Sequence, residues 1–318
     1  MAYGAVALAL VFTAGKAYSG KKTSTLVRQP SDSFLFNLVR MLMCILIGLT
    51  VVYAESAQHA FHVERDMAAI CLFAGASNAA LLIGWMLAVQ KCPLITVEVT
   101  MAAGSMIPAA LSAWLFAEPI AWQKMLGYGL VILSAVILSG YQNNTVEKTG
   151  LAGIALVILA TAGDGLTGFS QQLYRQYYTE NGVRARGVFY PVSIYQFYTF
   201  VFSALILLVC FGIYCVWRFW KKTPPASAPA PNQLFRTAAK ALPLIAVMAV
   251  CIFAVNYFQT LATGKYGMSP QILYPVIRGG SLIITTVNAM LFFGEKPTRR
   301  SILGTLVAFA GILAINIL

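Results

Sequence analysis

Two stretches of this chain, residues 93–140 and 270–318, share a pattern that strongly constrains how it can fold. Each begins with a proline, continues through an apolar run long enough to cross a bilayer, turns at a short charged segment and ends in a second apolar run. Matching residues stand 177 positions apart, as in the pairs Pro93 and Pro270, Glu118 and Glu295, and Gly127 and Gly304. We infer an internal duplication of about half the chain.

The composition indicates a membrane location. Of the 318 residues, 59% are hydrophobic and 10% are charged, whereas soluble domains carry about 25% charged residues. The formal net charge of +12 lies mostly between the apolar runs, where it reports membrane topology and contact with anionic headgroups. The sequence therefore predicts a polytopic membrane protein with lipids as neighbours and without nucleic acid as a partner.

The apolar runs predict ten transmembrane helices. They fall near residues 2–19, 33–54, 67–89, 93–116, 121–141, 150–174, 188–217, 241–263, 269–293 and 299–318. Five spans per copy is an odd number, so the second copy enters the membrane from the opposite side. The predicted fold is an all-α membrane protein with two inverted five-helix repeats around a central cavity. The first repeat covers residues 1–142 and the second 150–318, joined by a loop at 143–149.

Basic residues predict the orientation. A Pro/Ala-rich loop at 221–238 is bordered by lysines and arginines, and the loop after the first span and the turn before the last span are also basic. These three segments fall on one side of the membrane, which the positive-inside rule assigns to the cytoplasm. Both termini are then outside. The predicted location is the cell membrane, which the chain crosses several times, or the inner membrane in a bacterium.

Three ionisable side chains lie well inside the predicted spans, where facing lipid would be costly. Asp164 stands between two glycines in the middle of the sixth span. Its alternative role is a structural hydrogen bond to a neighbouring helix. Arg278 lies in the ninth span, where a guanidinium can bind a carboxylate or phosphate. Glu98 lies in the equivalent helix of the first copy, so we expect Glu98 and Arg278 to approach and neutralise each other.

Other polar residues are weaker candidates. Lys16 in the first span and Arg40 in the second lie nearer the span ends, where such side chains can also snorkel to the interface. Most intramembrane amides hydrogen-bond neighbouring helices, but Asn256 and Tyr274 are kept as possible ligand contacts. The predicted substrate-binding residues are therefore Arg278, Asp164, Glu98, Arg40, Asn256 and Tyr274.

Several of these features resemble the drug/metabolite transporter superfamily, in particular its ten-helix EamA-type branch. The resemblance rests on the proline-led span, the phrase Phe-Phe-Gly-Glu-Lys at 292–296 and Gly304 in the last apolar helix, and more loosely on Phe116-Ala117-Glu118-Pro119. It is good over spans eight to ten, fair over spans three to five, and elsewhere limited to the helix count. It implies an inverted-repeat fold with a central cavity. It also implies that both termini are cytoplasmic, whereas the distribution of basic residues places them outside.

The predicted function is secondary transport of a small polar or anionic metabolite by alternating access, with protons as a candidate coupling ion. Arg278 and Arg40 would bind an anionic group, and Asp164 or Glu98 would carry a proton or bind an amine. The alternative is a lipid flippase or scramblase of the same fold. An enzyme is not predicted, because no GxSxG or HExxH motif occurs.

No metal or other cofactor is predicted either. The six cysteines lie in or beside apolar spans without metal-ligand spacing. Both a monomer and a homodimer are compatible with the sequence.

Overall fold

The computed structural model describes residues 1–26, 30–55, 61–92, 94–117, 122–139, 150–180, 182–220, 231–294 and 298–317. These residues form helices and their connections, with no β-strand among them. The helices are α1 (Ala2–Ser24), α2 (Pro30–Glu55), α3 (Arg65–Lys91), α4 (Leu94–Ala103), α5 (Met106–Phe116), α6 (Trp122–Ser139), α7 (Leu151–Tyr178), α8 (Val192–Trp220), α9 (Pro231–Gly264), α10 (Pro270–Phe293) and α11 (Arg299–Ile317). The predicted all-α class is confirmed.

Six helices within this described part are long and apolar enough to cross a membrane. They are Ser31–Glu55, Arg65–Lys91, Leu151–Tyr178, Val192–Trp217, Ala241–Gly264 and Ile272–Phe292. Their outward faces carry large apolar side chains, and on α8 Leu208, Val209 and Ile213 are 51%, 60% and 64% exposed. Hydrocarbon is the solvent that suits such faces. The protein is therefore a multi-pass α-helical membrane protein.

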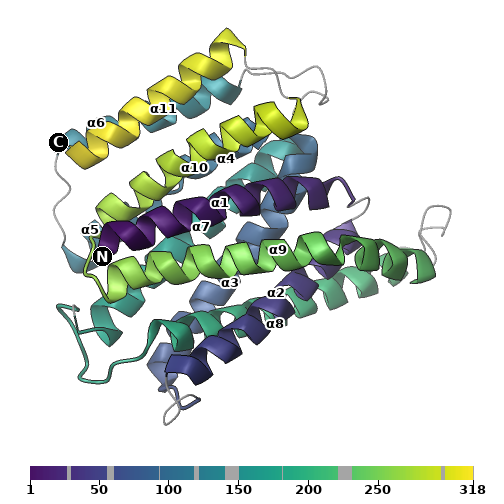
Figure 1. Ribbon diagram of the computed structural model, residues 1–318, viewed down its shortest axis with the longest axis horizontal. Coiled ribbons are helices and arrows are strands. Elements are labelled where there is room, and N and C mark those ends of the chain that lie inside the picture. The colour runs from purple at the N-terminus through teal and green to yellow at the C-terminus, as the bar shows by residue number, and fades with distance from the viewer. Residues whose placement is uncertain are drawn as a thin grey trace.

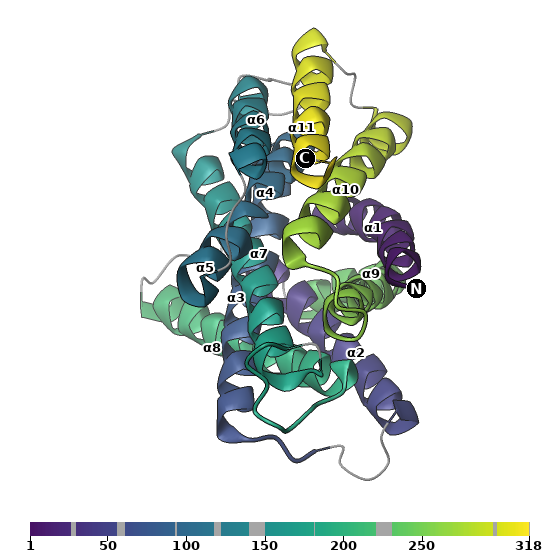
Figure 2. The same ribbon diagram turned by 90° about the vertical axis from the view of Figure 1, so that its left-hand side faces the viewer.

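The helices pack in long pairs, and both chain ends lie at one end of the molecule (Figure 1, left). α3 packs along α7, and α1 packs along α9. α6 lies beside α11 at one edge, whereas α2 lies beside α8 at the opposite edge (Figure 1). Figure 2 looks from the end that carries the termini and shows α4 and α10 between the α6–α11 pair and the central helices. The largest apolar cluster is built mainly from α2, α3, α8 and α9.

The predicted span 93–116 is divided into two helices, which corrects the expectation of one continuous span. A turn at Gly104 and Ser105 separates α4 from α5. Pro108 favours the break, because it has no N–H to donate to the carbonyl of Gly104 and its ring would clash with that carbonyl. The amides of Gly104 and Ser105 instead donate to carbonyls three residues earlier, at 2.9 and 3.2 Å.

α9 begins earlier than predicted, at Pro231 inside the segment 221–238 that was expected to be a loop. Proline suits the first turn of a helix because its missing N–H has no intrahelical partner there. No further proline follows until Pro243. Three other predicted features lie outside the described residues: the start of the Pro/Ala-rich loop at 221–230, the connecting loop 143–149, and the turn glutamates Glu118 and Glu295.

Candidate functional site

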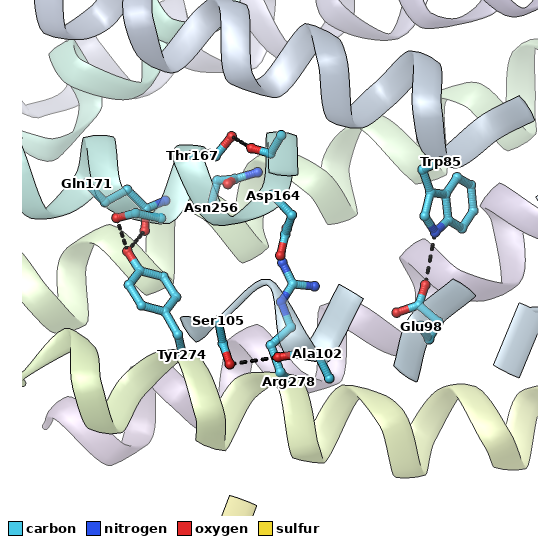
Figure 3. Close-up of polar contacts among 12 residues, drawn as sticks. Trp85, Glu98, Ala102, Ser105, Asp164, Thr167, Gln171, Asn256, Tyr274 and Arg278 are labelled. Atoms are coloured by element: carbon cyan, nitrogen blue, oxygen red, sulfur yellow. Dashed lines mark hydrogen bonds and ion pairs between the residues drawn. The ribbon is translucent and has the colours of Figure 1, made fainter. Parts of the chain in front are cut away.

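A buried ion pair links α7 to α10. Nη2 of Arg278 donates to Oδ1 of Asp164 (Figure 3). The two side chains are 14% and 7% exposed, so little bulk solvent reaches them. Each charge alone would be costly at this depth, whereas the pair lets both groups remain ionised.

Two glycines beside Asp164 allow neighbouring backbones to approach. A Cβ on Gly163 would lie 2.5 Å from the backbone nitrogen of Leu81 in α3. A Cβ on Gly165 would lie 2.6 Å from the carbonyl oxygen of Gly104 at the α4–α5 turn. Backbone atoms cannot move aside as a flexible side chain can, so α7 requires glycine at both positions. This packing holds Asp164 between α3, the α4–α5 turn and α10.

A second polar link joins the same two helices near the ion pair (Figure 3). The Tyr274 hydroxyl lies 2.6 Å from Oε1 of Gln171 and 2.9 Å from the carbonyl oxygen of Gly168. A hydroxyl has one proton, so Tyr274 donates to one of these oxygens at a time. Tyr274 and Arg278 are four residues apart on α10, and both therefore face α7.

A narrow polar cavity of about 40 Å³ adjoins the ion pair. Besides Asp164 and Arg278, its polar lining residues are Thr13, Lys16, Ser105, Thr167, Gln171, Asn256, Gln259, Tyr274 and Ser281. The volume is enough for a few water molecules, whereas ligand pockets usually measure about 300 Å³ or more. We call this space the central cavity, and it is closed to a metabolite in this conformation.

Glu98 does not pair with Arg278, which corrects the expectation from the sequence. Its Oε1 accepts a hydrogen bond of 3.0 Å from Nε1 of Trp85. Figure 3 shows the Glu98–Trp85 contact displaced along the helices from the ion pair of Arg278 and Asp164. α4 therefore supplies Glu98 and α10 supplies Arg278, and the two side chains have different neighbours.

Lys16 of α1 lies near the three charged side chains already described, Asp164, Arg278 and Glu98. Its side chain lines the central cavity, where Asp164 and Glu98 attract it and Arg278 repels it. Among the described residues it makes no direct ion pair. Lys16 therefore lies inside the helix bundle.

Arg40 of α2 is 1% exposed, and its hydrogen-bond partners are uncharged. Nη2 donates to Oδ1 of Asn37, Nη1 lies 3.0 Å from the sulfur of Met248, and Nε has no hydrogen-bond partner. Arg40 lines a second cavity of about 30 Å³, and Lys16 lines both this cavity and the central one. No group of three or more metal-ligating side chains occurs in the described part of the chain.

Asn256 of α9 also lines both cavities. Its Nδ2 donates to the carbonyl of Ile252 at 3.0 Å, and its own backbone carbonyl accepts from Nε2 of Gln196 at 3.2 Å. The structure thus brings Asn256, Tyr274, Asp164 and Arg278 together around the central cavity.

Trp85 is a site residue that the sequence reasoning missed. It lines the second cavity and hydrogen-bonds Glu98. Asn78 lines the same cavity and precedes Trp85 by seven residues, which is two helical turns. That spacing on one face of α3 was the signal that could have identified it.

A third and larger cavity, of about 570 Å³, lies where α2, α7 and α9 end and α8 begins. Its lining includes Glu55, Tyr174, Tyr178, Tyr190 and Tyr257. We call it the vestibule. It is large enough for a small organic molecule.

Comparison with known proteins identifies the fold and no family. No family model matches the chain, and no curated protein matches it. Among solved structures, 28 chains match. One of them, described only as the crystal structure of a protein, has a TM-score of 0.62 at 11% identity and covers 99% of this chain and 97% of that chain. At this identity the similarity establishes the fold alone, which is one already seen in an experimental structure over nearly its whole length.

Proposed function

We propose that this protein is a secondary transporter that moves a small polar metabolite with an anionic group across the cell membrane by alternating access. The observation that carries the proposal is the buried cluster of charged side chains around the two small cavities, in which cations outnumber carboxylates. Charged residues inside membrane spans are costly and commonly mark the path of a substrate or ion.

The charges of the cluster favour an anionic ligand. It contains three cations, Lys16, Arg40 and Arg278, and two carboxylates, Glu98 and Asp164. Asp164 neutralises Arg278, and Glu98 attracts Lys16. Arg40 remains with uncharged partners only. A buried cation without a counter-charge is destabilising, so a carboxylate or phosphate on the substrate would complete this site.

Asp164 is the proposed coupling group. Arg278 holds it in the closed conformation, and an incoming anion would compete for Arg278. Once released, the carboxylate would take up a proton or bind an ammonium group of the same substrate. An exchange of partners at one ion pair would therefore link substrate binding to the movement of a second charge.

The size of the central cavity supports a mechanism that requires movement. A space of about 40 Å³ does not admit a metabolite, so α10 and α7 must separate for substrate to enter. The turn at Gly104 and Ser105 lies against α7 and interrupts the helix beside the site. A break of this kind is a suitable hinge.

The helix pairing supports two structural repeats, with α4 and α5 counted as one span. We match α1, α2, α3, α4–α5 and α6 to α7, α8, α9, α10 and α11. If each helix is replaced by its match, the contact between α3 and α7 becomes a contact between α9 and α1. In the same way, α3–α8 becomes α9–α2, and α4–α6 becomes α10–α11. Each of these six contacts is present in the structure. The α6–α11 and α2–α8 pairs map onto themselves. A twofold relation between two copies produces this reciprocity.

Individual residues between α6 and α11 show the same reciprocity. The Ser134 hydroxyl donates to the carbonyl of Gly304 at 2.8 Å. Their matches at the separation of 177 residues are Gly311 and Gly127. A Cβ on Gly311 would lie 2.7 Å from the carbonyl oxygen of Gly127. The two backbones therefore approach each other closely at this matching position as well.

The ends of α5 and α10 also correspond. Ala117 and Gly294, again 177 residues apart, both adopt left-handed backbone angles, with φ of 54° and 63°. A left-handed residue is a common way to terminate a helix, although alanine is an unusual choice for it. These matches support a fold of ten spans in two inverted repeats, and with the sequence resemblance they support membership of the drug/metabolite transporter superfamily.

Thermal unfolding of the purified protein in detergent tests the proposal. Carboxylates, sugar phosphates, amino acids and lipids would be added separately, because a ligand of the folded state raises the melting temperature by mass action. We expect an anionic metabolite to stabilise the wild type and to lose this effect in Arg40→Gln and Arg278→Ala. Arg65→Gln, at the exposed start of α3, is the control and should respond as the wild type does.

Uptake of the same metabolite into proteoliposomes would then establish transport. Stabilisation by lipids alone, equal in the wild type and the variants, would refute the metabolite transporter and favour a lipid flippase or scramblase.

A further inference from the structure

The vestibule differs chemically from the central cavity. It lies about one helical turn farther along α7, since Tyr174 lines the vestibule and Gln171 lines the central cavity. On α9, Tyr257 and Leu261 line the vestibule, whereas Asn256 lines the central cavity. The two spaces are therefore neighbours along the same helices, but their side chains are of different kinds.

Aromatic rings make up much of the vestibule wall. Four tyrosines and one phenylalanine line it: Tyr174, Tyr178, Tyr190, Tyr257 and Phe189. The Tyr174 hydroxyl donates to the carbonyl of Tyr190 at 2.6 Å, and the rings of Tyr178 and Tyr190 meet edge to face with centroids 5.5 Å apart. Tyr174 and Tyr178 are buried and support the wall from behind, so the rings with surface exposed to a ligand are those of Phe189, Tyr190 and Tyr257.

The charges of the vestibule are mainly acidic. Glu55 and Glu180 line it and are exposed, against a single lining cation, Lys265. The hydroxyl of Tyr257 donates to Oε1 of Glu55, which ties one carboxylate to one ring across α2 and α9. The vestibule therefore has the sign of charge opposite to the excess in the central cluster.

One lining group has no partner. The Tyr178 side chain is fully buried, and its hydroxyl makes no hydrogen bond. A buried hydroxyl without a partner is destabilising relative to one that is bonded. This hydroxyl lies behind the surface of the vestibule, so it adds to the cost of the wall and is not a contact for a ligand.

We propose that the vestibule binds an organic ammonium ion. Aromatic faces attract a cation through their quadrupoles, and they suit alkylated ammonium groups that cannot form many hydrogen bonds. The two glutamates add attraction at longer range and lie where the cation would enter. The proposal is independent of the proposed transport function, because it rests on residues that the central site does not use.

Isothermal titration of the full chain in detergent with choline tests this inference. The comparison ligand is 3,3-dimethyl-1-butanol, an uncharged molecule of the same shape as choline in which carbon replaces the ammonium nitrogen. If ring faces and carboxylates recognise the charge, choline should bind about tenfold more tightly. Absence of saturable choline binding, or equal binding of the uncharged molecule, would overturn the proposal.

Variants locate the site. Tyr257→Leu removes a ring and should weaken choline binding about tenfold, whereas Tyr257→Phe keeps the ring and should retain most of the affinity. Glu55→Gln changes an exposed side chain and should weaken binding several-fold without affecting folding. Tyr3→Leu removes a tyrosine that is 74% exposed on α1 and should leave binding unchanged.

A final pair of measurements separates this inference from the transport proposal. Arg40→Gln should leave choline binding unchanged, and Tyr257→Leu should leave stabilisation by an anionic metabolite unchanged. Loss of choline binding in Arg40→Gln would place the ammonium site in the central cluster and refute the assignment to the vestibule.

Discussion

Replacing Arg278 by methionine should lower the free energy of unfolding by about 3–5 kcal/mol, because the substitution leaves the Asp164 carboxylate buried without its cation. Three features of the structure set the magnitude within this range. The side chain of Asp164 is 7% exposed, which favours the upper end. The central cavity has room for a few water molecules and Lys16 attracts Asp164, which both moderate the loss. We therefore expect a value nearer the lower end.

A double-mutant cycle isolates the interaction. Asp164→Asn removes the charge with little change of shape, and the double variant Asp164→Asn with Arg278→Met removes both charges. The double variant should be more stable than the sum of the single effects implies, by about 2 kcal/mol. The assay is unfolding in mixed micelles with increasing sodium dodecyl sulfate, followed by circular dichroism.

Two results would refute the reasoning. Additive single effects would mean that Asp164 and Arg278 do not interact in the folded protein. A loss below about 1 kcal/mol for Arg278→Met would mean that the site is hydrated well enough to tolerate a lone carboxylate. Arg65→Met, at an exposed arginine, is the control and should leave the free energy of unfolding unchanged.

Three further outcomes are expected. Gly163→Ala should destabilise the protein by about 1–3 kcal/mol, because the new Cβ meets the α3 backbone at 2.5 Å, whereas Gly212→Ala meets nothing within 4 Å and should have little effect in the same micelle assay. Tyr274→Phe should cost about 1 kcal/mol by removing the hydroxyl that bonds α7, and an unchanged midpoint would contradict that bond. Removing the exposed ion pair between Arg186 and Asp66 should change the melting temperature far less than removing the buried pair, and a comparable fall would contradict the role given to burial.

Position within a helix was predictable from the sequence for some site residues and not for others. Asp164 and Arg278 were recognised because each lies at least nine residues from both ends of its predicted span. Lys16 and Arg40 were placed nearer the span ends because the predicted spans ended at residue 19 and began at residue 33. α1 continues to Ser24 and α2 begins at Pro30, so both side chains lie farther from the helix ends than their apolar runs suggested. Polar residues at helix ends hide the true length of a helix from hydropathy.

The class of the protein follows from its amino-acid sequence alone. Apolar runs of membrane-spanning length exclude a soluble fold, and Pro108 removes one helical hydrogen bond where one predicted span divides into α4 and α5. These are local effects of composition and backbone chemistry, which neighbouring residues in the chain are sufficient to produce.

The partners of the buried charged side chains follow from the tertiary structure. The sequence suggested Glu98 for Arg278, but Arg278 binds Asp164, which is 114 residues away. The choice depends on the rotation and axial position of whole helices, and these follow from close contacts such as that of Gly163 with the α3 backbone. The same packing leaves Arg40 without a counter-charge and encloses the vestibule. No local pattern encodes such relations, because they arise where segments distant in the chain meet.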